Sequence, residues 1–459
     1  MRRILWFRRD LRVEDNPLLS LEGEVLPIFI FDTNILEKLS ANDRRIGFIF
    51  NALIRLKTAL QERGLDLAIF YGKPIDVFTL LLKQESFHEV CASGDYDSYA
   101  RKRDRDVSLL LPFNYLNDTY IFKPDELLKN NGTPYLVFTP FYNRAKTLFR
   151  PEHMAESLPA KQTRIDFDCS VIHSIDRNKH TILPITLEAI GFFPQPLSEH
   201  QTLSPEEKLA RFEDKLENYQ RDRDFMALNA TSWLGIDLRF GTISIRALLR
   251  WLMVQKQKGV DSEPFFRQLI FREFYAMLLY HFPHLEWKNF RYPFRGIENH
   301  EFYEAFCTGN TGIPIIDAGI RQLLESGEMH NRVRMICASF FTKNLLLPWQ
   351  WGERFFAEHL MDYDAASNIL SWQWCAGTGI DPQPYFRIFN PYIQSAKFDK
   401  NGLYTKTYLP EVRDIPTKFL SDEKSLINYP IQGYSHPIVN HKSSSTRALD
   451  YFKSELSKC

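Results

Sequence analysis

The chain has 459 residues, of which 44% are hydrophobic and 25% charged, a composition typical of a globular protein of roughly two to four domains. Its 57 Lys and Arg residues balance 57 Asp and Glu residues. This balance excludes a wholly basic protein that coats nucleic acid, but it leaves room for a local basic groove. The charged N-terminus and the lack of an apolar run of about 18 residues predict neither a signal peptide nor a membrane helix.

The six cysteines form no C-x-x-C pair, and no His/Cys cluster has zinc spacing. This scatter predicts reduced thiols, a cytoplasmic location and no metal site. Aromatic residues make up 14% of the chain and concentrate after about residue 220. They are explained either by a large aromatic core or by a site that stacks planar ligands.

Residues 1–130 alternate between short apolar runs and helical patterns. Strands are predicted at 3–8, 25–31, 65–72 and 88–94, and helices at 44–63, 74–84 and 99–111. Asn16 and Pro17 are expected to open a further short helix, and Gly64 to end the 44–63 helix. Alternating strands and helices predict an α/β doubly wound domain with a parallel sheet. The glycine motifs of dinucleotide-binding and P-loop modules are absent.

Residues 131–205 have weak periodicity and scattered Pro, Ser and His, which predicts a connector between domains. From 206 to 459 helical patterns dominate and no strand is indicated, so an all-α domain is predicted there. The clearest helical patterns cover residues 205–225, 244–257, 264–281, 315–327 and 331–347.

Three stretches carry a family resemblance. They are ILWFRRDLRVEDNPLL near the N-terminus, TGIPIIDAGIRQLLESGEMHNRVRMICASFFTKNLLLPWQWGERFF, and LMDYDAASNILSWQWCAGTGIDPQPYFRIFNP. The first two resemble motifs of the photolyase/cryptochrome family, and the third closely resembles bacterial cyclobutane pyrimidine dimer photolyases. The likeness runs from residue 3 to about 400 and is densest over 311–391. It implies that the C-terminal all-α domain binds FAD.

The resemblance implies that Tyr219, Thr231, Ser232, Trp233 and Leu234 hold the FAD phosphates and ribitol. A Thr-Ser pair ahead of a helix offers hydroxyls and free N–H groups to a diphosphate. Without the resemblance, a plain helix N-cap would be the preferred explanation of this pair. The sequence departs from the family pattern at the next position, where Gly235 stands in place of the Ser found in many relatives.

Asn331, Arg334, Asp362, Asp364 and Asn368 match family positions around the flavin ring. The resemblance implies an ion pair between Arg334 and Asp364. It also implies that Asn368 faces flavin N5, where a side-chain amide can accept from a protonated nitrogen or donate to an unprotonated one. Such an amide would favour the reduced forms of the cofactor.

Trp372 and Trp349 match two members of the tryptophan chain that reduces the flavin in light, although core packing explains buried tryptophans as well. The third, solvent-side tryptophan is missing where it aligns, near Gly296. Tyr292 or Trp287 would have to replace it.

On the lesion side, Trp374 and Met335 match positions that face a flipped-out pyrimidine dimer, and Arg223, Arg332 and Arg387 match positions that take phosphates. Such phosphate contacts would make the affinity depend on salt.

Two lesion-side positions depart from the dimer photolyases. Gln268 stands where they have a Glu that bonds the pyrimidine, and Phe271 where they have a second stacking Trp. A Gln here resembles the (6-4) photolyases, but those enzymes carry two His where this chain has Asn331 and Met335. The resemblance therefore favours cyclobutane dimers, with Trp374, Asn368, Met335 and Gln268 as the catalytic set.

The activity implied is light-driven repair of cyclobutane pyrimidine dimers, by electron transfer from photoexcited reduced FAD to the dimer. The expected partner is damaged DNA, and the expected state is a monomer. A second antenna chromophore is open: Lys102 stands where folate-binding members have Glu, so a deazaflavin, another flavin or none all remain. The alternative function is a cryptochrome-like FAD photoreceptor that signals through a protein partner, and the short segment after residue 400 speaks against it.

Overall fold

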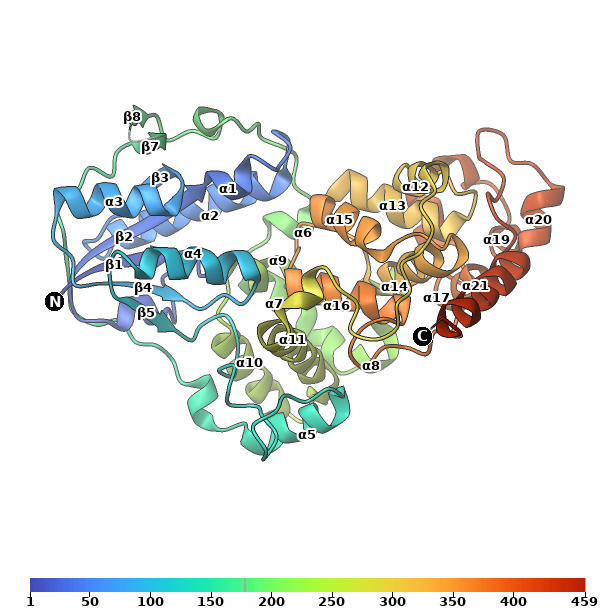
Figure 1. Ribbon diagram of the computed structural model, residues 1–459, viewed down its shortest axis with the longest axis horizontal. Coiled ribbons are helices and arrows are strands. Elements are labelled where there is room, and N and C mark those ends of the chain that lie inside the picture. Colours follow the sequence, from blue (N-terminus) through green and yellow to red (C-terminus); the bar gives the residue numbers. More distant parts are fainter. Residues whose placement is uncertain (177–178, 459) are drawn as a thin grey trace. The chain divides into compact units, whose positions relative to one another are not determined.

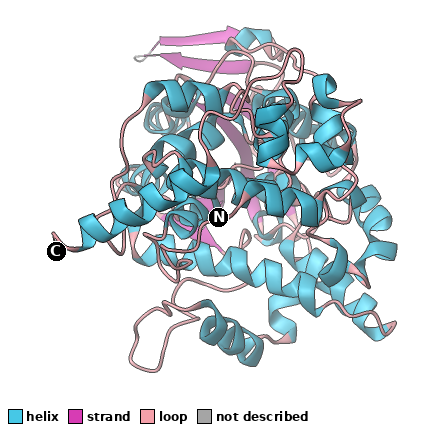
Figure 2. Cartoon of the chain, turned by 90° about the vertical axis from the view of Figure 1, so that its right-hand side faces the viewer, coloured by secondary structure: helices cyan, strands magenta, loops and turns pink. Residues whose placement is uncertain are grey.

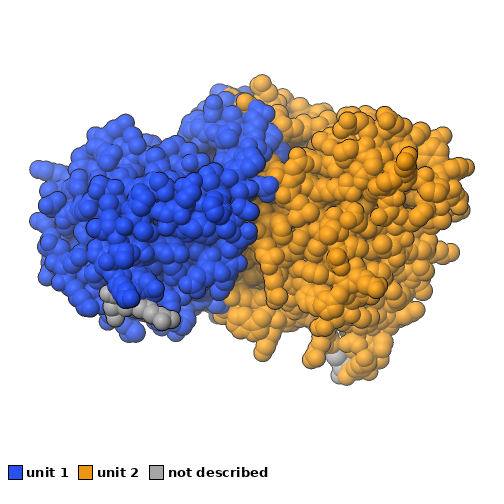
Figure 3. Space-filling model, turned by 90° about the horizontal axis from the view of Figure 1, so that it is seen from above, with its two compact units in different colours: residues 1–134, 142–210, 233–273 blue, residues 135–141, 211–232, 274–459 orange. Residues whose placement is uncertain are grey.

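The computed structural model describes residues 1–176 and 179–458, and Cys459 lies outside the described residues. Two compact units are present, each assembled from several pieces of the chain (Figure 3). Unit 1 comprises residues 1–134, 142–210 and 233–273, and unit 2 comprises 135–141, 211–232 and 274–459. Because both units are discontinuous in sequence, the boundaries at residues 130 and 205 stay a prediction.

Unit 1 contains all the described strands (Figures 1 and 2). These are β1 (Arg2–Phe7), β2 (Gly23–Asp32), β3 (Ala68–Gly72), β4 (Glu89–Ser93), β5 (Phe113–Leu116), β6 (Gln162–Arg164), β7 (Ile172–Asp176) and β8 (Lys179–Leu183). They form one eight-stranded sheet of order β5-β4-β1-β2-β3-β7-β8, with β6 beside β2. All the pairings are parallel except that between β7 and β8.

The helices of this part include α1 (Thr33–Leu36), α2 (Arg44–Gln61), α3 (Pro74–Gln84) and α4 (Ser98–Ser108), with a 3-10 turn η1 (Pro17–Ser20). Near-continuous apolar runs form the central strands, as expected for strands covered on both faces. In register, Ile4 of β1 lies beside Leu26 of β2 and Val90 of β4, and all three are buried. The predicted α/β doubly wound domain is confirmed.

Residues 131–205 hold more regular structure than a plain connector. They contain the strands β6, β7 and β8, the helices α5 (Phe138–Leu148) and α6 (Glu199–Thr202), and the 3-10 turns η2 (Pro151–Met154) and η3 (Glu188–Ile190). The three strands escaped detection because they are short, and because they complete a sheet whose core strands lie elsewhere in the sequence.

The remaining elements are helical, and no described residue after 205 lies in a strand. They are α7 (Pro205–Leu216), α8 (Tyr219–Asp222), η4 (Met226–Leu228), α9 (Gly235–Phe240), α10 (Ile245–Gln257), α11 (Glu263–His281), η5 (Pro283–Glu286), α12 (His300–Cys307), α13 (Pro314–Ser326), α14 (Asn331–Ser339), a π-turn η6 (Phe340–Asn344), α15 (Trp349–His359), α16 (Ala365–Ala376), α17 (Pro391–Phe398), α18 (Leu403–Tyr408), η7 (Pro410–Val412), α19 (Thr417–Leu420), α20 (Glu423–Asn428) and α21 (His441–Leu456). The predicted all-α C-terminal domain is confirmed.

Two predicted helices are shorter than expected. The pattern over 205–225 breaks at Leu216, and that over 331–347 ends as an α-helix at Ser339 and continues as the π-turn η6.

In unit 2 the turn before α13 is held by the buried Asp317 carboxylate, which accepts hydrogen bonds from the Thr311 and Gly312 N–H groups at 2.8 and 2.9 Å. The largest fully buried side chains of unit 2 include Phe340, Phe341 and Trp372.

Candidate FAD and DNA site

Helix α14 supplies the first half of the site in unit 2. The Arg334 guanidinium pairs with Asp362 at 3.0 Å and donates to the Met329 carbonyl at 2.8 Å. The ion pair is half-buried. Asp364, which sequence reasoning paired with Arg334, is instead the N-cap of α16, where its carboxylate accepts from the Ser367 N–H at 3.0 Å. Asp364 is used for capping because the first N–H groups of a helix have no intrahelical partner.

Asn368, one turn into α16, has a fixed amide orientation. Its Nδ2 donates to the backbone carbonyl and to the carboxylate of Glu353, both at 3.0 Å. Burial raises the pKa of the Glu353 carboxyl. A flipped amide would place its oxygen against two acceptors, so the Oδ1 atom is held away from Glu353. No described residue donates to Oδ1, which leaves it available to a donor on a ligand.

The two predicted electron-transfer tryptophans are both buried. Trp349 begins α15 and donates from Nε1 to Asn289 at 2.8 Å. Trp372 packs edge-on against Phe341 and Phe356, with ring centroids 5.4 and 5.0 Å apart.

The third tryptophan of the chain is sterically excluded at its aligned position. Gly296 has φ +79°, and a Cβ there would lie 2.6 Å from the Pro348 nitrogen. Of the two suggested replacements, Trp287 is 54% exposed and Tyr292 is 41% exposed. A role for either in electron transfer stays a prediction.

The Trp372 indole packs directly against the backbone of Gly352, so that a Cβ on this residue would lie 2.2 Å from Cη2 of the indole. Changing Gly352 to Ala should therefore lower the free energy of unfolding by about 1–2 kcal/mol. Overpacking costs roughly 1–3 kcal/mol, and alanine's helix propensity returns at most about 1 kcal/mol. Urea unfolding measures the change. Gly47→Ala is the matched control, since its Cβ would meet nothing within 4 Å and should stabilise the protein slightly. Equal effects of both changes would contradict this packing argument.

Helix α14 also brings together Asn331, which the resemblance assigns to the flavin ring, and Met335, which it assigns to the lesion. Asn331 and Met335 are four residues apart, and the Asn331 amide lies 3.8 Å from the Met335 sulfur. Met335 and Trp374 are both partly exposed. Partly exposed apolar side chains of this kind can receive a planar ligand.

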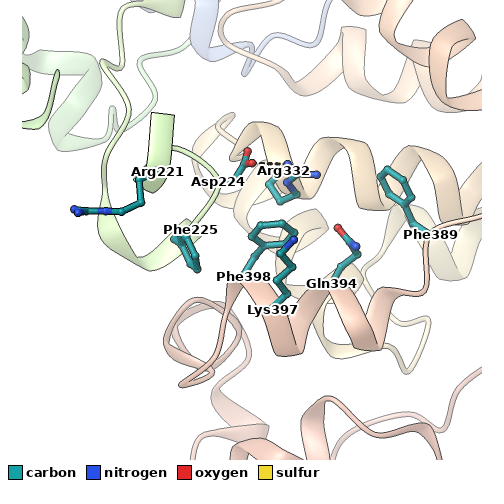
Figure 4. Close-up of a pocket in the computed structure, with 8 residues that line it drawn as sticks. All are labelled: Arg221, Asp224, Phe225, Arg332, Phe389, Gln394, Lys397 and Phe398. Atoms are coloured by element: carbon teal, nitrogen blue, oxygen red, sulfur yellow. Dashed lines mark hydrogen bonds and ion pairs between the residues drawn. The ribbon is translucent and has the colours of Figure 1, made fainter. Parts of the chain in front are cut away.

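A cavity of about 390 Å³ in unit 2 surrounds Arg332 (Figure 4). The guanidinium pairs with Asp224 at 2.6 Å and lies 4.4 Å from the Phe398 ring centroid. Its Nε and the Oε1 of Gln394 are buried without a hydrogen-bond partner. The other lining residues are Arg221, Phe225, Phe389 and Lys397. Cations, aromatic faces and unsatisfied polar atoms together suit a strand of nucleic acid.

Sequence reasoning missed most of this cavity. It found Arg332 through the resemblance, but Phe225 and the α17 residues Gln394, Lys397 and Phe398 lie far from Arg332 in sequence. The one local signal was the pair of arginines at 221 and 223, each followed by an aspartate. The folded chain brings them together because α17 packs its C-terminal end toward the loop after α8, where the Phe225 and Phe398 rings meet edge-on at 5.8 Å.

The remaining arginines differ in their surroundings. Arg223 lies 5.7 Å from the Tyr219 ring centroid and 3.9 Å from Asp224. Arg387 is exposed on the loop between α16 and α17, and among the described residues nothing pairs with its guanidinium. Arg387 is thus the more available of the two for an external anion.

His330 is the N-cap of α14, where its Nδ1 accepts a hydrogen bond from the backbone N–H of Arg332 at 3.1 Å. Burial lowers the pKa of its imidazole to about 4. The folded protein therefore holds His330 neutral, whereas the unfolded chain protonates it below about pH 6.5.

Stability should fall as the pH drops from 6.5 to 4, by about 3 kcal/mol from this group, because the unfolded state binds the extra proton. His330→Asn keeps an N-cap and should flatten this part of the profile. Unfolding midpoints at several pH values measure the slope, with His436→Asn as the control. An unchanged slope in His330→Asn would refute the assignment.

The predicted phosphate segment straddles the division of the chain. Thr231 and Ser232 end a piece of unit 2, and Trp233 and Leu234 begin a piece of unit 1. Trp233 has φ +57° and stacks on His200, with centroids 4.1 Å apart. Tyr219 is buried in unit 2. Their contacts with FAD stay a prediction.

Gln268 and Phe271 lie on α11 in unit 1. The Gln268 amide donates back to the Pro264 carbonyl of its own helix at 3.3 Å. The Phe271 ring lies 5.8 Å from the Arg267 guanidinium. Their lesion-side roles stay predictions.

Two family models match the chain. Residues 3–162 match the model described as DNA photolyase, and residues 265–454 match the FAD binding domain of DNA photolyase. The second match covers α14, α16 and the residues around Asn368. The fold and the site thus define a flavoprotein with an α/β part and a helical FAD-binding part.

Whole-chain relatives agree with these matches. A deoxyribodipyrimidine photo-lyase of Alkalihalophilus pseudofirmus is 33% identical, over 98% of both chains. A class III photolyase of Agrobacterium tumefaciens has a TM-score of 0.85 at 30% identity and covers 99% of this chain and 98% of its own. A Sulfolobus tokodaii photolyase crystallised with two FAD molecules has a TM-score of 0.80 at 30% identity over 100% of both chains. The chain belongs to the DNA photolyase family.

Among the described residues, no helix is long and apolar enough to cross a membrane. The five described cysteines, Cys91, Cys169, Cys307, Cys337 and Cys375, are free thiols. A cytoplasmic location and a monomeric state stay predictions.

Proposed function

We propose that this protein repairs cyclobutane pyrimidine dimers in DNA in a reaction driven by light. The proposal rests on the cavity around Arg332, which combines cations and aromatic faces as a nucleic-acid strand requires. A photoreceptor that signals only through a protein partner has no need of such a cavity. The relatives named deoxyribodipyrimidine photo-lyase support the same choice.

The residues around Asn368 suit a flavin ring. A half-buried ion pair, Arg334 with Asp362, offers both charge signs to a polar heterocycle. The Asn368 Oδ1 is an oriented acceptor without a donor of its own. Asn331 and Asp364 complete the proposed ring contacts, and Tyr219 with Thr231–Leu234 the phosphate and ribitol contacts.

Bound FAD would supply light absorption and one-electron donation. The protein's share is binding and orientation. The Asn368 amide, locked by Glu353, would accept a hydrogen bond from a ring N–H and so favour the protonated ring. Trp374 and Met335 would pack on the dimer, and Gln268 would donate to a pyrimidine carbonyl. Trp372 and Trp349 would carry electrons inward.

Arg332, Arg223 and Arg387 would contact DNA phosphates, joined by Lys397 from the cavity. Phe386, which is 63% exposed beside Arg387, would contact bases next to the lesion. Extrusion of the dimer is favoured because its base pairing is already weak. A second chromophore is proposed on the precedent of the Sulfolobus photolyase, with its identity open.

The deciding experiment uses purified, chemically reduced protein and an oligonucleotide with a single thymine cyclobutane dimer. Blue light should restore two thymines, and a dark sample should not. The same assay with a (6-4) product tests the meaning of Gln268. If FAD is bound but no dimer is lost in light, the repair proposal fails and the photoreceptor function takes its place.

A further inference from the structure

Lys343 is a fully buried cation that the proposed repair reaction has not used. It lies in the π-turn η6 with 0% of its surface exposed. Its Nζ donates to the carbonyl of Arg387 at 2.7 Å, and no described carboxylate forms an ion pair with it. A buried ammonium without a counter-ion is costly, so its position calls for a reason.

The carbonyl that Lys343 holds belongs to the loop between α16 and α17. Two further bonds fix this loop: the Phe389 N–H donates to Ser339 Oγ at 3.2 Å, and the Gln383 amide donates to the Cys375 carbonyl at 2.9 Å. Lys343 therefore anchors the backbone of Arg387 from inside while the Arg387 guanidinium points to solvent without a described partner.

Few charges act on Lys343. Burial lowers the pKa of its ammonium to about 8, and the charge of Arg387 adds to this shift. Burial also raises the pKa of the Cys375 thiol to about 12, so the thiol stays neutral. On the other elements packed against η6, Arg447 of α21 donates to the Asn344 carbonyl and Glu353 of α15 accepts from Asn368. Cys337 of α14 is a buried thiol, and burial lowers the pKa of His441 on α21.

Two positive charges therefore meet at Arg387: its own guanidinium, and the ammonium of Lys343, which bonds its backbone carbonyl. No described residue supplies a counter-charge to either. We propose that Lys343 is a positioning residue and the buried second cation of an anion site at Arg387, so that a DNA phosphate bound there favours the protonated lysine. The inference rests on the proposed function, because it takes the anion to be a phosphate of the bound strand. By reciprocity, protonation of Lys343 tightens phosphate binding by the same factor.

The coupling predicts proton uptake when DNA binds. A lysine whose pKa is about 8 is half deprotonated at pH 8, so a roughly threefold coupling should make binding take up about a quarter of a proton there and almost none at pH 6.5. Between pH 7 and 9 the affinity of the wild type should fall roughly threefold more than that of Lys343→Arg, which stays charged.

The test is calorimetric titration of the full-length protein with the dimer oligonucleotide in buffers of different ionisation heat. The proposal is supported if the wild type and the control Lys453→Arg take up protons on DNA binding at pH 8, and if Lys343→Arg lacks the part of this proton uptake that belongs to Lys343. Equal uptake in all three, with DNA bound, overturns it and leaves the proposed DNA binding intact. Absence of any binding at pH 7 overturns both. If Lys343→Arg does not fold, the wild type alone decides. Proton uptake on DNA binding that stays the same from pH 8 to pH 6.5 overturns the proposal.

Discussion

Asn368→Asp should lower the repair rate per absorbed photon at least about tenfold. The new carboxyl would face the buried Glu353, whose backbone carbonyl and side-chain carboxylate now each accept a hydrogen bond from Asn368 Nδ2 at 3.0 Å. Two facing carboxyl groups repel each other when both are ionised, and the Nδ2 donor that orients the Oδ1 acceptor toward a ligand is lost. A lost hydrogen bond to a charged group costs about 1.5–3 kcal/mol, or more than tenfold in rate.

Loss of dimers in blue light, with the FAD content of each sample measured by absorbance, checks this prediction. Asn401→Asp is the matched control, because Asn401 is exposed and its side chain makes no described contact. The site assignment fails if Asn368→Asp retains FAD and repairs dimers at the wild-type rate.

Trp374→Ala should weaken binding of the dimer oligonucleotide about 10- to 100-fold. Stacking of one base on an aromatic ring is worth roughly 1–3 kcal/mol, and the partly exposed indole of Trp374 is the proposed platform. Binding of undamaged single strands should change less, because the Arg332 cavity and the exposed Arg387 are left intact.

Fluorescence anisotropy with dimer-containing and undamaged oligonucleotides in the dark separates these effects. Trp351→Ala removes another tryptophan, which stacks on His300 with centroids 5.1 Å apart, and should leave the affinity unchanged. A dimer affinity that survives Trp374→Ala would move the lesion elsewhere.

Local pattern was enough for most of the core of the fold. The helix predicted at 74–84 has the bounds of α3, and the strands around Ile4 and Val90 were found because apolar runs between turn signals identify buried parallel strands. The strands β5, β6, β7 and β8 were not found, because a short strand is defined by its neighbour in the sheet rather than by its own side chains.

The helix boundary at Ser339 shows a different limit. The apolar pattern continues through Leu347, so it indicates one helix, whereas the chain changes to a π-turn that places Lys343 inside unit 2. A π-turn adds one residue to a helical turn and leaves no periodic signal in a short window.

The sequence by itself determined the family and the FAD-binding part, because these depend on residue types at matching positions. The roles of residues such as Asn368 and Trp374 rest on the same resemblance and stay predictions. Only the tertiary structure decided that Arg334 pairs with Asp362 rather than Asp364, that Glu353 orients Asn368, and that Lys397 and Phe398 join Arg332 in one cavity. These are relations between side chains far apart in the chain or on different turns. Distance and orientation fix them, and neither is written in the order of residues.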